Sequence, residues 1–237
     1  MALEFGNSER LAAMRQSLSS QNPKYKYINT QNKHFNYQIN HTMKTVKFLA
    51  ALFFVASVAV AKPAPTPLKV DTQASTFNWL AKKFGGQHNG TINIQSGTIL
   101  IDKNKLVGGE FAIEMASLKD LDGQGGMVQR LENHLKSDDF FNAEKFPTST
   151  LKITKVAPKG GEIVEITGDL TIKGVTQPIT FPATVKLSPT GLTAAAKFMV
   201  DRTKFGLKYR SKTFFAEIGD KMIDDEFEVD VKIVATK

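Results

Sequence analysis

Apolar and polar residues alternate in block after block along most of the second half of the chain. A period of two gives a strand one apolar and one polar face, so each block predicts a half-buried β-strand. The apolar positions of successive blocks are Phe77 and Trp79; Ile92 and Ile94; Ile99 and Ile101; Phe111, Ile113 and Met115; Leu151 and Ile153; Val164, Ile166, Leu170 and Ile172; Ile179, Phe181, Ala183, Val185 and Leu187; Leu192, Ala194, Ala196, Phe198 and Val200; and Phe227, Val229, Val231 and Ile233.

Glycine-rich turn signals separate these blocks. We take as turns Ser96-Gly97, Gly108-Gly109, Lys159-Gly160-Gly161, Lys173-Gly174 and Ser188-Pro-Thr-Gly191. About eight strands joined by short turns predict an all-β fold, either an antiparallel sandwich or a closed β-barrel. A barrel has no free edges, and at about eight strands its interior holds packed side chains or one small ligand.

One segment between the strands has helical rather than strand spacing. Met127, Leu131 and Leu135 recur every four residues, which predicts one face of a helix. Ser137 or Asp138 could then cap a further helical turn, because a short side-chain oxygen accepts a free backbone N–H there. Pro147 ends the segment in an extended conformation. The pattern predicts a helical crossover that plugs one end of the β-structure.

The first 61 residues are expected to lie outside the working domain. Residues 1–42 are polar without periodicity and read as a disordered upstream extension that is not native, with Met43 as the true start. Residues 43–61 contain two lysines, an apolar run of 13 residues and an A-x-A site that ends at Ala61. This is the pattern of a secretory signal peptide, and the run is too short to span a bilayer, which needs about 20 residues. We therefore expect a periplasmic or secreted protein.

The remaining chain is long enough for one ordinary domain with its own core. A Pro-rich leader occupies residues 62–67, and we expect the barrel to occupy residues 68–237. Residues 1–61 hold seven of the 31 basic and two of the 23 acidic residues, which leaves 24 basic and 21 acidic residues, a net charge of +3. That balance does not favour a nucleic-acid partner. The chain has no cysteine, so the core must hold the fold without disulfides.

Few residue patterns point to catalysis. After residue 61 the chain has two histidines, His88 and His134, and neither lies in a zinc-binding spacing such as H-E-x-x-H. The glycine-rich stretch 123–126 does not follow a strand as a phosphate site requires, and we interpret it as a flexible hinge. Asp138 and Asp139 could bind a metal with His134, but a helix cap beside a solvated carboxylate is the favoured interpretation.

Basic and aromatic residues alternate between Asp201 and Phe215. The basic and aromatic residues of this stretch are Arg202, Lys204, Phe205, Lys208, Tyr209, Arg210, Lys212, Phe214 and Phe215. Such a mixture can follow a nucleic-acid backbone and stack its bases, or border a pocket mouth that binds an anionic headgroup and an apolar tail. The favoured interpretation is a solvated loop whose charges balance Asp220, Asp224, Asp225 and Glu226. The sequence leaves these alternatives open.

Several linked motifs closely resemble the YceI-like family in order and spacing. They are His134-Leu-Lys-Ser-Asp-Asp-Phe-Phe, Lys145-Phe-Pro147, Gly168-Asp-Leu-Thr-Ile-Lys-Gly-Val-Thr-Gln-Pro178, and Arg202 with Phe205-Gly206, preceded by Trp79, His88-Asn-Gly-Thr91 and Gly97. The resemblance covers roughly residues 68–235. One departure is visible: many members carry Arg-Asp just before the His-Leu pair, whereas the positions here are Leu131-Glu132, with Arg130 next to them. The resemblance therefore does not carry over a headgroup contact from that arginine.

The resemblance implies a lipocalin-like antiparallel β-barrel with a short helical insertion. Characterised members bind a polyisoprenoid or similar long amphiphile in the barrel, are exported, and as a family have no established catalytic activity. We expect Trp79, Phe111, Ile113, Phe181 and Phe198 to form the inner wall. Near the mouth we expect Arg202, Tyr209 and His134, while Phe140 and Phe141 are either the plug or part of the pocket.

The predicted function is thus non-catalytic carriage or sequestration of an isoprenoid-type lipid, with no metal and no cofactor other than the bound lipid. Two other classes remain as alternatives. One is a stress-related barrel with a filled core that acts through a protein partner. The other is an unrecognised hydrolase or isomerase, whose bases would be His88 and His134. The sequence also leaves open a homodimer and does not identify the ligand.

Overall fold

The computed structural model describes residues 63–237, which fall within one unit of the chain, Lys62–Lys237. The predictions for residues 1–42 and for the signal peptide at 43–61 lie outside the described residues. The first strand begins at Thr66, inside the predicted leader, so only its first few residues precede the β-structure. No helix within residues 63–237 has the length and hydropathy needed to cross a bilayer.

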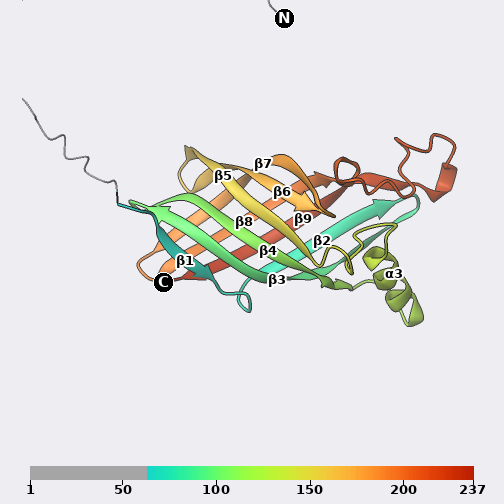
Figure 1. The fold of residues 1–237 in the computed structure, drawn as a ribbon, viewed down its shortest axis with the longest axis horizontal. Coiled ribbons are helices and arrows are strands. Elements are labelled where there is room, and N and C mark those ends of the chain that lie inside the picture. The colour runs from blue at the N-terminus through green and yellow to red at the C-terminus, as the bar shows by residue number, and fades with distance from the viewer. Residues whose placement is uncertain (1–62) are drawn as a thin grey trace, which may run out of the picture. The chain divides into compact units, whose positions relative to one another are not determined.

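Nine antiparallel strands and one α-helix make up the fold (Figure 1). The strands are β1 (Thr66–Val70), β2 (Thr76–Lys83), β3 (Gly86–Asp102), β4 (Lys105–Asp120), β5 (Thr148–Gly160), β6 (Ile163–Ile172), β7 (Val175–Ser188), β8 (Gly191–Asp201) and β9 (Ile223–Thr236). The helix α3 (Gly126–Lys136) interrupts them between β4 and β5, and short 3₁₀ turns η1 (Arg202–Phe205) and η2 (Gly219–Lys221) lie between β8 and β9.

The sheet closes on itself. Its order is β1-β3-β2-β9-β8-β7-β6-β5-β4, and β3 also pairs with β4, which joins the two ends of the series. Both β1 and β2 lie between β3 and β9: β2 pairs with their parts near Thr91 and Val229, and β1 with their parts near Ile99 and Ala235. The nine strands therefore fill eight places around the ring, which confirms the predicted barrel of about eight strands.

Two of the predicted turns are wrong. Gly97 lies inside β3, which runs unbroken through residues 86–102 with an irregularity between Ile94 and Ser96. A Cβ on Gly97 would lie 2.8 Å from Cγ2 of Val70, so this glycine permits close packing of β1 on β3. Likewise Gly108 and Gly109 lie within β4, and the chain reverses earlier, at Lys103 and Asn104, both with positive φ. A glycine pair can thus mark close backbone approach as readily as a turn.

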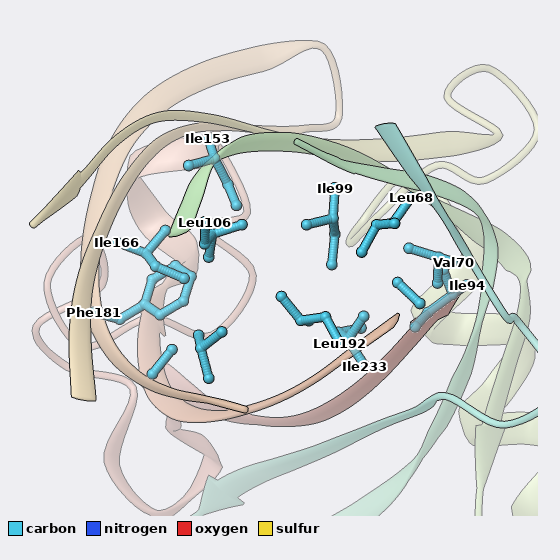
Figure 2. Packing of buried hydrophobic residues seen from close by; sticks show 13 residues of the cluster. Leu68, Val70, Ile94, Ile99, Leu106, Ile153, Ile166, Phe181, Leu192 and Ile233 are labelled. Atoms are coloured by element: carbon cyan, nitrogen blue, oxygen red, sulfur yellow. The ribbon is translucent and has the colours of Figure 1, made fainter. Parts of the chain in front are cut away.

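Among the described residues, inward side chains form three apolar clusters along the barrel. Figure 2 shows residues of one cluster pointing inward from opposite walls, among them Leu68, Ile99, Ile153, Phe181 and Ile233. In Figure 1 one end of the barrel holds β1, which contributes Leu68 to this cluster, and the C-terminus. The helix α3 and the segment between β8 and β9 lie at the opposite end. The two ends therefore differ: one is filled by aliphatic side chains, and the other is built from helix and loops.

The helical insertion differs in detail from its prediction. α3 covers the expected positions, but Met127 is 65% exposed, and the helix buries Glu132 rather than a complete apolar stripe. Ser137 does not cap a new helical turn; its Oγ donates to the carbonyl of His134, 2.7 Å away, at the end of α3. The residues after it form turns that bring Phe140 into the interior, where it is buried, before β5 begins at Thr148.

Candidate ligand-binding cavity

A cavity of about 580 Å³ lies inside the barrel. It extends from Leu106 and Ile153, among the aliphatic residues of the filled end, to Lys83, Arg210 and Asp220 at the loop-built end. This volume is within the range of about 300–1,000 Å³ found for small-molecule pockets. The barrel core is therefore incompletely filled by its own side chains, and the space is continuous with the end that carries α3.

All ten residues predicted to form the site border this cavity. The wall residues come from four strands: Trp79 from β2, Phe111 and Ile113 from β4, Phe181 from β7 and Phe198 from β8. The remaining five lie toward the loop-built end: His134 in α3, Phe140 and Phe141 in the turns after it, Arg202 in η1 and Tyr209 in the loop beyond. Their proximity to the cavity is a geometric fact, and contact with a ligand stays a prediction.

Two phenylalanines stack in the cavity wall. The rings of Phe181 and Phe198 are parallel to within 13°, with centroids 4.1 Å apart. Small residues of β8, Ala194 and Ala196, also line the cavity. A wall of flat apolar rings and alanines suits an apolar chain better than a polar substrate.

Three rings meet where α3 approaches the barrel. The His134 imidazole makes edge-to-face contacts with Phe140 at 5.1 Å and with Tyr209 at 4.8 Å between centroids, and Phe140 lies 5.3 Å from Tyr209. His134 Nε2 also lies 2.9 Å from Oδ2 of Asp139. The ring cluster joins a helix residue to a loop some 75 positions away, and it borders the cavity on the side where a ligand would enter.

Arg202 is a buried clamp rather than an exposed cation. Its side chain is 4% exposed, and its Nε, Nη1 and Nη2 donate to the backbone carbonyls of Asp224, Leu207 and Ile223 at 2.9, 2.6 and 2.9 Å. Burial lowers the pKa of Arg202, while the nearby Asp225 carboxylate opposes that shift. Three of its N–H donors thus bind the backbone, and Nη2 also lies 3.5 Å from Oδ1 of Asp225, so Arg202 holds the β8–β9 segment beside the cavity.

Glu132 is a buried charged residue of α3 that binds the end of β4. Its carboxylate accepts the backbone N–H of Asp120 at 3.2 Å and the Nζ of Lys119 at 3.3 Å, which fastens α3 to the end of β4. Burial acts to raise the pKa of Glu132, but the Asp120 N–H bond and the charges of Lys119 and Lys136 lower it more, so the pKa of Glu132 lies below its ordinary value. Glu132, just before the His134-Leu135 pair, therefore holds α3 against the barrel in this chain.

Besides Arg202, further charged residues border the cavity, and of these only Arg210 belongs to the basic and aromatic stretch of residues 201–215. At the loop-built end the cavity is bordered by four cationic side chains, those of Lys82, Lys83, Arg210 and Lys221. The carboxylates of Asp220 and Asp224 and the ring of Phe84 border it as well. The Lys-Lys-Phe run before Gly85 marks the β2–β3 hairpin tip, but nothing local places that tip beside residues 210–221. The long-range pairing of β2 with β9 does so.

The alternative metal set at the helix end does not assemble as one group. His134 bonds Asp139, whereas the Asp138 carboxylate accepts from Nδ2 of Asn142 at 2.7 Å and lies 3.3 Å from Nζ of Lys173. The Asn142 bond, and then Lys173, lower the pKa of the fully exposed Asp138. The two neighbouring carboxylates therefore serve different partners.

Comparison with known proteins is consistent across sequence and structure. The family model described as the YceI-like domain matches residues 68–235. A UPF0312 protein of Vibrio vulnificus is 35% identical over 94 residues, 40% of this chain and 48% of the relative. Protein YceI of Escherichia coli is 48% identical over 52 residues, 22% of this chain and 27% of the relative. The chain thus spans about half the length, or less, of the curated relatives it matches.

Two solved structures share the fold. BcnA of Burkholderia cenocepacia matches with a TM-score of 0.59 and 23% identity, over 70% of this chain and 99% of BcnA. A polyisoprenoid binding domain from Saccharophagus degradans, implicated in plant cell wall breakdown, matches with a TM-score of 0.53 and 15% identity, over 71% of this chain and 97% of that domain. At these identities the likeness shows a common barrel architecture.

Proposed function

The chain belongs to the YceI-like family, and from that premise we propose that it binds a polyisoprenoid-type lipid, or another long amphiphile, inside its barrel without transforming it. The observation that carries the proposal is the apolar cavity of about 580 Å³ along the barrel core. The name of the Saccharophagus relative, a polyisoprenoid binding domain, supports the same ligand class.

The energetics favour a long chain over a short one. Each methylene transferred from water to an apolar site contributes about 0.8 kcal/mol. Association costs about 4–15 kcal/mol in lost freedom before any net affinity appears. A chain of about 20 carbons therefore gains about 16 kcal/mol, enough to offset that cost, whereas one of about five carbons does not.

The polar residues at the open end support a defined orientation. Lys82, Lys83, Arg210 and Lys221 outnumber Asp220 and Asp224 around the cavity border. A headgroup with negative charge would lie favourably there while the tail occupies the wall of Phe181 and Phe198. We thus propose an acidic or phosphorylated headgroup at the loop-built end.

Export is a further part of the proposal. The basic, apolar and A-x-A pattern of residues 43–61 supports cleavage after Ala61 and action in the periplasm or outside the cell. Mass spectrometry of the native protein tests this, because a mature N-terminus at Lys62 is expected. A peptide from residues 1–42 in the native protein would contradict it.

The binding test uses the chain's single tryptophan, which borders the cavity. Organic extraction of the purified protein, followed by mass spectrometry, should release one lipid per chain. Titrating the delipidated protein with a long-chain polyprenyl phosphate should then change the emission of Trp79 with saturation. Because Trp79 is 9% exposed, added lipid that stays in solvent should not alter its emission.

A matched pair of variants on β8 separates binding inside the barrel from binding outside it. Ala196 lines the cavity, and Ala196→Phe fills part of it, whereas Thr193 is exposed on the same strand. We expect Ala196→Phe to weaken the polyprenyl phosphate response at least about 10-fold, the cost of roughly 1.4 kcal/mol, and Thr193→Phe to leave it unchanged. Equal responses from both, or no extracted lipid and no titration, would favour a filled barrel that acts through a protein partner.

A further inference from the structure

Three side chains with metal-binding groups meet where β3 and the end of β4 pair. His88, Asp120 and Asp122 each offer a ligand atom, and these atoms all lie within 4.8 Å of one another. His88 Nδ1 lies 3.1 Å from Oδ1 of Asp122 and 3.8 Å from Oδ1 of Asp120. The antiparallel pairing of Gly90 with Asp120 brings them together, so no local spacing in the sequence groups them.

Asp120 is a buried carboxylate with few partners. Its side chain is 1% exposed, and neither carboxylate oxygen has a hydrogen-bond partner among the described residues. Its own backbone N–H is bound by Glu132, which also takes Nζ of the neighbouring Lys119, and the ion partner assigned to Asp120 is the partly exposed His88, 3.8 Å away. A buried carboxylate in this position is unfavourable unless a cation or a proton neutralises it.

The surrounding backbone is shaped to hold that carboxylate. A Cβ on Gly123 would lie 2.3 Å from Oδ2 of Asp120, so only glycine leaves room for the side chain there. Asp122 is fixed from the other side, since Nδ2 of Asn89 donates to its Oδ2 at 3.3 Å. Gly123, the first residue of the glycine-rich stretch that the sequence presents as a hinge, therefore packs against the Asp120 carboxylate.

We propose that His88, Asp120 and Asp122 form a binding site for a divalent transition-metal ion, best represented by Zn²⁺. Zinc binds imidazole nitrogen and carboxylate oxygen at about 2.0–2.2 Å in a tetrahedral arrangement, which places neighbouring ligand atoms about 3.3 Å apart. The spacing of 3.1 and 3.8 Å around Nδ1 of His88 already approaches that value. A neutral imidazole and two carboxylates would balance the charge of the ion.

The exposure of the three groups gives the ion an entry path. The side chains of His88 and Asp122 are 31% and 29% exposed, while Asp120 closes the site from the interior. Solvent would supply the fourth ligand on the exposed side, as in zinc sites with three protein ligands.

The test is calorimetric titration of the chelator-treated full chain with ZnCl₂, with thermal unfolding as a second measurement. We expect saturable binding and a higher unfolding temperature with zinc for the wild type. Asp120→Asn and His88→Gln should each lower the zinc affinity at least about 10-fold. Calcium, which takes 6–8 oxygen ligands, should not bind at the concentration where zinc saturates.

A control variant is available at the other histidine. His134 and Asp139 form a similar pair, with 2.9 Å between Nε2 and Oδ2, but no third carboxylate is assigned to them. Asp139→Asn should therefore bind zinc as the wild type does. Loss of zinc binding only in Asp139→Asn, unchanged binding in both Asp120→Asn and His88→Gln, or calcium bound in preference to zinc would overturn the site. Because His88 is partly exposed, His88→Gln tests it even if Asp120→Asn destabilises the fold. These measurements do not depend on the lipid.

Discussion

Removing the guanidinium of Arg202 should destabilise the protein strongly. Arg202→Met keeps the apolar stem but removes donors to three backbone carbonyls, those of Leu207, Ile223 and Asp224. Hydrogen bonds from charged donors are worth about 1.5–3 kcal/mol each, and breaking a buried charged contact costs about 3–5 kcal/mol overall. Because the carbonyls can partly regain water when the segment opens, we expect a loss of about 3–5 kcal/mol.

Urea unfolding followed by the emission of Trp79 measures this loss. With a denaturant dependence of about 2 kcal/mol/M, the midpoint should fall by about 1.5–2.5 M. The unfolding midpoint of Arg202→Lys should lie between those of the wild type and Arg202→Met, since an ammonium cannot reproduce the fork of the guanidinium. The matched control is Lys204→Met in the same 3₁₀ turn, because its side chain is 66% exposed and it should change stability by less than about 0.5 kcal/mol.

Two results would refute this reasoning. A loss below about 1 kcal/mol for Arg202→Met would mean that the three carbonyls find other partners at little cost. Full stability of Arg202→Lys would mean that charge alone matters, not the geometry of the fork. In the first case the segment between β8 and β9 would be held by the packing of Phe205 and Leu207, both buried, rather than by Arg202.

Two further predictions concern α3 and the barrel wall. Because the pKa of Glu132 is lowered in the folded state, its contribution to stability is present above its ordinary pKa and is lost as pH falls through the folded value. The free energy of unfolding, measured with urea at a series of pH values, should therefore fall less below about pH 4.5 in Glu132→Gln than in the wild type. A Cβ on Gly90 would lie 1.8 Å from the carbonyl oxygen of Lys119, so Gly90→Ala should lower stability by about 2–4 kcal/mol in thermal unfolding, whereas Gly126→Ala, with no atom within 4 Å, should not.

The fold was largely predictable because each strand has one face toward a single interior. Ile92 and Ile94 are buried as their alternation predicts, and so are Ile166 and Ile172 on β6. The prediction failed at glycines, where the reason for the residue is a neighbouring strand rather than a turn. Gly109 illustrates this, since its Cβ would approach the carbonyl of the paired β3 to 2.8 Å. That constraint arises only after the strands pair.

The candidate site was predictable in part for a related reason. Aromatic residues on the apolar face of a strand must point into the barrel, so Phe181 and Phe198 border the cavity as expected. Residues outside the strands have no such rule. Arg202 and Arg210 lie in one basic stretch of the sequence, yet one is buried against backbone carbonyls and the other borders the cavity with its guanidinium over the ring of Tyr209, at 5.2 Å.

Buried charge in this barrel occurs where strand pairing ends. Among the described residues, the buried charged side chains are Asp120, Glu132 and Arg202, and all three lie at the end that carries α3 and the β8–β9 segment. Paired strands satisfy their own backbone groups, so the opposite end can be filled with aliphatic side chains such as Leu68 and Ile99. Where the chain leaves the sheet, its N–H and C=O groups need other partners, and Glu132 and Arg202 supply them. At this end buried charge therefore supplements apolar packing, since Phe140, Phe205 and Leu207 are buried in the same region.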